Sequence, residues 1–146
     1  MKKTRKLRSQ KTGLAPGALV HVGERRTAQT DIALFEYDAA ALRETRFASL
    51  AASREHVRGP GTLWLNVHGL HEPEVMAEIG RRFGLHPLVL EDILNTDQRP
   101  KVDDYGDYLY LVARIFEYDA ASGTVGSDQV SIVLGADFVL TFQERP

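Results

Sequence analysis

The sequence predicts an α/β fold in which a mixed β-sheet is flanked by helices on both faces, an α/β/α sandwich. Short segments of alternating or continuous apolar residues recur along the chain and are typical of strands. Two segments between them begin with proline and carry apolar residues at helical spacing. The strand expected at 107–118 is apolar on both of its faces, which indicates a layer of structure on each side of the sheet.

Length and composition indicate one soluble globular domain. The 146 residues are enough to bury a hydrophobic core, and a content of 43% hydrophobic and 26% charged residues is typical of such domains. The sequence contains no run of about 18 apolar residues and no apolar signal segment after Met1, so the chain as given is expected to be soluble and not exported. Cysteine is absent, which leaves oxygen and imidazole as the available metal ligands.

Basic residues are concentrated at the start of the chain. Residues 1–12 hold six of the 18 Lys and Arg residues and no acid, so residues 13–146 carry 12 basic against 20 acidic residues and are net acidic. A basic arm can bind nucleic acid or anionic lipid, but this one has no interleaved aromatic residues. We expect a solvated, disordered arm at 1–12, a single domain at 13–146 and no nucleic-acid partner.

The first half of this domain is expected to contain strands around one helix. Strand-like sequence begins at Leu19, alternates over Asp31–Tyr37, and returns at Thr62–Val67 after the Gly-Pro-Gly turn at 59–61. The segment Ala39–Leu50, between the second and third of these strands, is predicted to be helical.

The second half is expected to contain two short helices followed by three strands. Pro73 suits the first position of a helix that Gly84 ends, and Pro87 starts a second helix that runs to about Asn95. The three strands are expected at 107–118, 129–134 and 138–143.

An acidic face on the second helix is the first candidate site. At about 100° per residue its apolar residues fall on one half of the surface, and three oxygen-bearing side chains share the other half: Glu91, Asp92 and Asn95. Carboxylates beside an amide suit a hard cation such as Mg²⁺, which commonly takes only one or two carboxylates from a protein. The same pattern is typical of a solvated helix face, so the spacing leaves both interpretations open. A further acidic group lacks the glycine and glutamate of an EF-hand loop and is interpreted as strand-edge charge: Asp103, Asp104 and Asp107.

A histidine group near the middle of the chain is a second candidate. Imidazole and carboxylate both ligate zinc, which leaves open a small metal-dependent hydrolase built on His68, His71 and Glu72. The spacing matches no helical HExxH motif, however, and His86 just before Pro87 is expected to cap a helix. The sequence contains no G-x-S-x-G elbow, P-loop or dinucleotide fingerprint, so it predicts no enzyme.

A long collinear string carries a family resemblance. Residues 84–102 read GLHPLVLEDILNTDQRPKV, and the aromatic strand DYLYLVARIFEYD follows shortly after. The strings PGALVHVG near the start, WLNVHGLH in the middle and QVSIVLGADFVLTFQE at the end extend the match. The chain thus resembles the N-terminal cytosolic domain of the CorA magnesium and cobalt transporters over most of its length.

The resemblance implies an α/β/α domain that lies at the cytoplasmic face of the membrane within a homopentamer. In the family this domain continues into a long stalk helix and two membrane spans, and the chain stops at Glu144-Arg145-Pro146, where the stalk would begin. The pore and its Gly-Met-Asn signature would lie beyond that point, so this chain by itself is not expected to conduct ions. A related zinc transporter is an alternative within the same family.

The resemblance also implies a regulatory cation. In the family, the acidic residue of the LEDI segment faces a neighbouring subunit and shares Mg²⁺, or another divalent cation such as Co²⁺, with an acidic group on the stalk of that neighbour. Asp92 occupies the matching position here, and Glu91 is expected to contribute to a second, looser site. Asp97 stands where a family member carries histidine, so the details of the loop after the helix are expected to differ.

Overall fold

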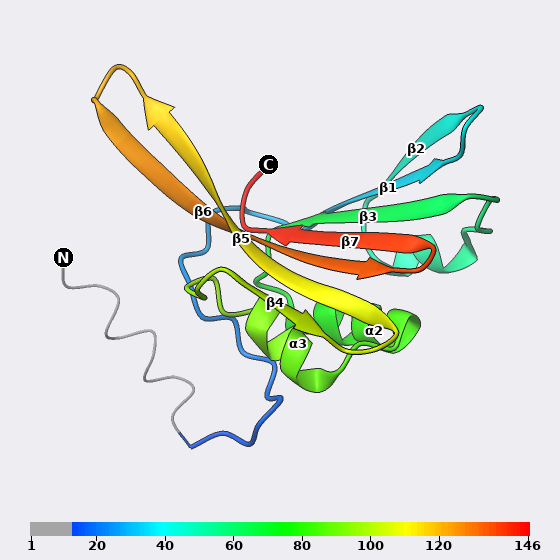
Figure 1. Ribbon diagram of the computed structural model, residues 1–146, viewed down its shortest axis with the longest axis horizontal. Coiled ribbons are helices and arrows are strands. Elements are labelled where there is room, and N and C mark those ends of the chain that lie inside the picture. The colour runs from blue at the N-terminus through cyan, green and yellow to red at the C-terminus, as the bar shows by residue number, and fades with distance from the viewer. Residues whose placement is uncertain (1–12) are drawn as a thin grey trace.

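A seven-stranded mixed sheet forms the body of the protein (Figure 1). The structure, a computed structural model, describes residues 13–146; the arm expected at 1–12 lies outside the described residues. The strand order is β2-β1-β3-β7-β6-β5-β4, and β3 pairs parallel with β7 whereas the other neighbours pair antiparallel. The strands are β1 (Asp31–Tyr37), β2 (Leu42–Phe47), β3 (Thr62–His68), β4 (Lys101–Asp104), β5 (Tyr108–Asp119), β6 (Thr124–Gly135) and β7 (Phe138–Gln143).

Two α-helices follow β3 and pack against the sheet. Helix α2 (Pro73–Phe83) begins at its proline and ends at Gly84, which adopts the left-handed conformation with φ of 65°. Helix α3 (Pro87–Ile93) begins at the next proline. Proline suits the first helical position because it has no N–H to satisfy there, and glycine suits the left-handed cap because it has no Cβ. The predicted starts of both helices and the predicted end of α2 are therefore confirmed.

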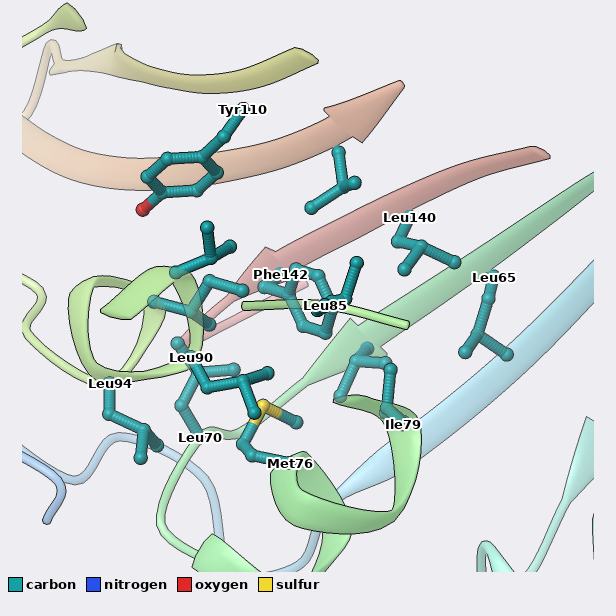
Figure 2. Close-up of a cluster of buried hydrophobic side chains, with 14 of the residues drawn as sticks. Leu65, Leu70, Met76, Ile79, Leu85, Leu90, Leu94, Tyr110, Leu140 and Phe142 are labelled. Atoms are coloured by element: carbon teal, nitrogen blue, oxygen red, sulfur yellow. The ribbon is translucent and has the colours of Figure 1, made fainter. Parts of the chain in front are cut away.

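The core lies between the helices and one face of the sheet. Aligned positions of five neighbouring strands point into it, and all five side chains are buried: Leu34, Leu65, Leu140, Val133 and Tyr110. Figure 2 shows Leu65 and Leu140 facing the same cluster as Met76 and Ile79 of α2. Each fully buried aliphatic side chain contributes about 1.5–3 kcal/mol, so this face supplies most of the stability that holds the helices in place.

The predicted helix at Ala39–Leu50 is wrong. The structure has strand β2 at Leu42–Phe47, paired antiparallel with β1, and a short 3₁₀ helix, η2 (Ala51–Glu55), follows it. The Asp38 carboxylate accepts hydrogen bonds from the N–H groups of Ala40 and Ala41 and so closes the turn that returns the chain alongside β1. Pairing with an existing strand outweighs a local helical preference in this segment.

The predicted α/β class with a mixed sheet is confirmed, but its helices are arranged differently from the expectation. Within residues 13–146, α2 and α3 lie on the same side of the sheet (Figure 1). The 3₁₀ helix η2 also lies beside α2, and Arg54 of η2 forms an ion pair with Glu78 of α2. On the opposite face Trp64 stacks on Phe35 with ring centroids 4.8 Å apart and donates a hydrogen bond to Thr141 Oγ1.

The β5–β6 hairpin projects beyond the rest of the sheet (Figure 1). The two strands pair with each other from Tyr108–Gly135 out to Asp119–Thr124, but β4 and β7 pair only with the half nearest the core. The sequence predicted that β5 is covered on both faces, but its first half is buried on one face and only partly buried on the other. The distal half is open, since Phe116 and Tyr118 are 70% and 67% exposed.

Candidate functional site

Helix α3 presents the acidic residues that the sequence singled out. His86 caps the helix, since its Nδ1 accepts a hydrogen bond from the N–H of Leu88 at 3.2 Å, as predicted. Val89 and Ile93 are completely buried, which fixes the rotation of the helix about its axis. Glu91 and Asp92 therefore lie on the outer half, each partly exposed.

Contacts at both ends hold α3 in position. At its start the N–H of His86 donates to the hydroxyl of Tyr108 on β5 at 2.9 Å. At its end Val22 forms an isolated parallel bridge with Asn95, and the N–H of Val22 donates to Leu94 O at 2.8 Å. The strand-like sequence after Leu19 thus serves to anchor the end of this helix.

Asp92 is held by two partners from the segment that follows the helix. Gln98 Nε2 donates to Asp92 Oδ1 at 2.8 Å, and Lys101 Nζ donates to Asp92 Oδ2 at 2.7 Å. The Asp92 side chain is 27% exposed, so its carboxylate is accessible from solvent while both oxygens are engaged. The sequence predicted the outward position of Asp92 but neither of these partners.

Lys101 bridges two carboxylates. Its ammonium lies 2.7 Å from Asp92 Oδ2, 2.7 Å from Asp103 Oδ2 and 5.3 Å from the centroid of the Tyr110 ring. Burial by itself would lower the pKa of Lys101, but the hydrogen bonds to Asp103 and Asp92 outweigh it and raise the pKa well above its ordinary value. The lysine is therefore a permanent positive charge between two acids.

The loop after α3 is fixed by the buried side chain of Gln129 on β6. Gln129 Oε1 accepts from the N–H of Gln98 at 2.8 Å, and its Nε2 donates to Asn95 O at 3.1 Å. Arg114 donates to Gln98 O at 3.1 Å and lies 3.6 Å from Asp97 Oδ1. Sequence reasoning missed Gln129, because it stands at one of the polar positions that alternate with Val130 and Ile132 and so gave no signal of being buried.

Glu91 turns toward a different part of the chain. Its Oε2 accepts a hydrogen bond from the N–H of Gly17 at 2.7 Å, so it helps to hold the lead-in segment against α3. Glu91 and Asp92 share the outer half of the helix, as predicted. Gly17 donates to Glu91, whereas Gln98 and Lys101 donate to Asp92.

The histidines of the second candidate site do not gather. Gln143 and Asn66 contact His68 Nε2 at 2.8 and 3.1 Å, and burial lowers the pKa of His68 below its ordinary value. His71 Nε2 lies 3.7 Å from Glu72 Oε1. In the part of the chain that the structure describes, no three His, Asp or Glu side chains come close enough to hold a metal ion. The zinc centre on which a hydrolase would depend is therefore not formed there.

The donor set around Asp92 fits a hard cation in type but is incomplete within residues 13–146. Carboxylate oxygens are the ligands that Mg²⁺ takes, and Asp92 and Asp103 converge on a single positive charge. That charge is the lysine ammonium, however, so a metal ion at Asp92 would have to replace it and find further ligands elsewhere.

Solved structures identify the class of this fold. The soluble domain of CorA from Methanocaldococcus jannaschii matches with a TM-score of 0.54 over 79% of this chain and 41% of that chain, at 14% identity. The full-length CmaX protein matches with a TM-score of 0.62 over 84% of this chain and 37% of that chain, at 18% identity. The described residues thus have the fold of a CorA-type soluble domain.

Sequence comparisons then give the family. The profile of the family described as CorA-like Mg²⁺ transporter protein matches residues 60–146. The cobalt/magnesium transport protein CorA of Thermotoga maritima is 38% identical over 137 residues, which is 94% of this chain and 39% of that protein. The magnesium transporter ALR2 of Saccharomyces cerevisiae is 34% identical over 89 residues, 60% of this chain and 10% of that protein. The chain belongs to the CorA-like Mg²⁺ transporter family.

The chain spans about two fifths of the length of its Thermotoga relative. Among residues 13–146, no helix has both the length and the apolar character needed to cross a bilayer.

Proposed function

We propose that this chain is the cation-sensing part of a CorA-type Mg²⁺/Co²⁺ transporter. It would lie on the cytoplasmic face of the membrane, as part of a homopentameric transporter. The regulatory ion would be Mg²⁺, or Co²⁺, held between neighbouring subunits with Asp92 as a ligand and Glu91 contributing to a second site.

The position of Asp92 is the observation that carries this proposal. Its carboxylate is partly exposed on a helix whose inner face is completely buried, so the helix offers a fixed acid to a neighbour. Within the described residues the metal ligands around it are too few for a closed site. A carboxylate presented outward with an incomplete ligand set is what a site shared between two subunits requires.

Gating would follow from charge at the interface. Bound Mg²⁺ would supply the positive charge that offsets the repulsion between Asp92 and an acidic group of the adjoining subunit. Without it the two carboxylates repel, and the subunits separate or tilt. High internal magnesium would then favour the closed arrangement.

The required difference in affinity is modest if the sites act together. Shifting a two-state equilibrium from 1:99 to 99:1 takes about a 10⁴-fold preference of the ligand for one state. Divided among five equivalent interfaces, this is about a sixfold preference per site. A weak site can therefore regulate the assembly, provided that it exists in only one arrangement of the subunits.

A magnesium titration of the chain extended through the segment that follows it in its relatives tests the proposal. Protection from limited proteolysis is measured against Mg²⁺ concentration for the wild type and for Asp92→Asn. Asp107→Asn is the matched control, because it makes the same change of charge at an exposed position of the loop before β5.

We expect Asp92→Asn to shift protection to higher Mg²⁺ concentration and Asp107→Asn to leave it unchanged. If Asp92→Asn is protected at the same Mg²⁺ concentration as the wild type, Asp92 is not a ligand. Tight Zn²⁺ binding that depends on His71 would instead support the hydrolase alternative.

A further inference from the structure

Lys101 differs from the other cationic side chains of the described residues. Residues 13–146 contain eleven arginines and one lysine, and this lysine is the residue that contacts the candidate cation ligand. An ammonium group is a compact, strongly hydrated point charge on a flexible stem, whereas a guanidinium is a planar fork. Of the cationic side chains, lysine therefore most resembles a small cation in shape and charge.

The position of the ammonium is that of a counter-ion. It lies 2.7 Å from an oxygen of Asp92 and 2.7 Å from an oxygen of Asp103, above the ring of Tyr110. Asp92 Oδ1 is held independently by Gln98, so the Asp92 carboxylate keeps its orientation when the lysine moves. The Lys101 side chain is 32% exposed and belongs to β4, the edge strand, which leaves it room to swing away.

We propose that Lys101 is an internal counter-cation of Asp92, which occupies this carboxylate when no divalent cation is bound and is displaced when one binds. Lys101 would thereby set the cation concentration at which the site fills. This inference rests on the proposed function, because it assumes that Asp92 is a cation ligand.

The two partners of Lys101 make the exchange possible. A divalent cation at Asp92 repels an ammonium that remains in contact with the same carboxylate. Lys101 gives up only one of its two acids on displacement, because Asp103 retains it. The exchange therefore leaves no buried charge without a partner. The free-energy cost of such a charge would otherwise prevent the cation from displacing Lys101.

Neutral replacements of Lys101 test the inference. Lys101→Met keeps the length of the stem and removes the charge, and Lys101→Gln keeps a hydrogen-bond donor in case the methionine variant does not fold. Arg99→Met is the matched control, because it removes one positive charge two residues away at an exposed position. Each variant is made in the same extended chain that tests the proposed function and is titrated with MgCl₂ while the NMR amide signals of residues 91–95 are followed. Urea unfolding reports whether the fold is kept.

We expect both neutral variants to bind Mg²⁺ about fivefold more tightly than the wild type, since a partly exposed ion pair changes an equilibrium constant by about this factor at most. Lys101→Arg and Arg99→Met are expected to bind no more tightly than the wild type. If Lys101 only stabilised the fold, its neutral replacements would lower the urea midpoint without raising the affinity for Mg²⁺.

The outcomes separate this inference from the proposed function. If Asp92→Asn abolishes the Mg²⁺ response while the neutral Lys101 variants bind no more tightly than the wild type, the counter-cation role is overturned and Asp92 remains a ligand. If Asp92→Asn leaves the response unchanged, the proposed function itself fails. Absence of any Mg²⁺-dependent change at residues 91–95 in the neutral variants also overturns the inference, because these are the chains in which Asp92 is uncovered.

Discussion

Close contact between α2 and α3 at Gly80 leads to a prediction about stability. Gly80 is buried, and a Cβ added to it would collide with Cδ1 of Leu90 and lie 3.2 and 3.3 Å from Cδ2 and Cγ of the same side chain. Because three atoms of Leu90 are crowded at once, rotating a single methyl group does not relieve the contact. Gly80→Ala is therefore expected to overpack the helix interface.

Two opposing terms decide the size of the effect. Alanine in place of glycine inside a helix gains about 1 kcal/mol from backbone preference. Overpacking a well-filled core costs about 1–3 kcal/mol. Leu90 is buried and has little space to retreat. We expect overpacking to win and the free energy of unfolding to fall by about 1–2 kcal/mol.

Urea unfolding, followed by the fluorescence of Trp64, the single tryptophan, provides the measurement. The matched control is Gly84→Ala at the C-terminal cap of the same helix, where an added Cβ meets nothing within 4 Å but φ is +65°. That variant is expected to lose about 1–2 kcal/mol through backbone conformation alone.

Leu90→Ala distinguishes the two mechanisms. Alone it is expected to cost about 2–5 kcal/mol through the cavity it leaves. Combined with Gly80→Ala it should cost about 1 kcal/mol less than the sum, because the new methyl group enters the vacated space. Combined with Gly84→Ala it should be additive. A Gly80→Ala variant that is more stable than the wild type would refute the reasoning.

Two further predictions concern the surface. The guanidinium groups of Arg54 and Arg82 lower the pKa of Glu78 from 4.5 to about 2, so this pairing stabilises the fold fully above about pH 4.5 and its contribution is lost as the pH falls toward 2. Glu78→Gln is therefore expected to lose less stability than the wild type between about pH 5 and pH 3, which urea midpoints at the two pH values check. Phe116→Ser is expected to change the free energy of unfolding by no more than about 0.5 kcal/mol, because the side chain is 70% exposed on the projecting hairpin. A loss well above this in urea unfolding would mean that the distal hairpin is packed in solution.

Helix α3 shows how far sequence reasoning can go. Pro87 and the apolar spacing after it predicted both the start of the helix and the outward direction of Asp92, and the structure has both. These features are local, since a cap and a helical stripe depend on residues within a few positions of each other. Strand β7, predicted at 138–143, is observed with the same bounds. Its prediction was also local, because it came from a short apolar segment next to a tight turn.

Strand β2 is an element that local sequence patterns did not predict. Its residues are mostly exposed, so no alternation of buried and exposed positions marked it as a strand. Its conformation comes from hydrogen bonding to β1, which is a pairing that the sequence of β2 alone does not encode. The arrangement of α2 and α3 on one face was likewise missed, because it depends on how the chain crosses the sheet.

The sequence by itself determined the α/β class, the family resemblance, the caps of the two helices and the presence of an outward acid at Asp92. The tertiary structure alone decided what surrounds that acid: Gln98 and Lys101 beside it, Asp103 behind the lysine, and Gly17 on the neighbouring Glu91. The physical reason is that hydrophobic periodicity and caps act over a few residues, whereas a charge is matched by whatever group the folded chain brings within about 3 Å of it.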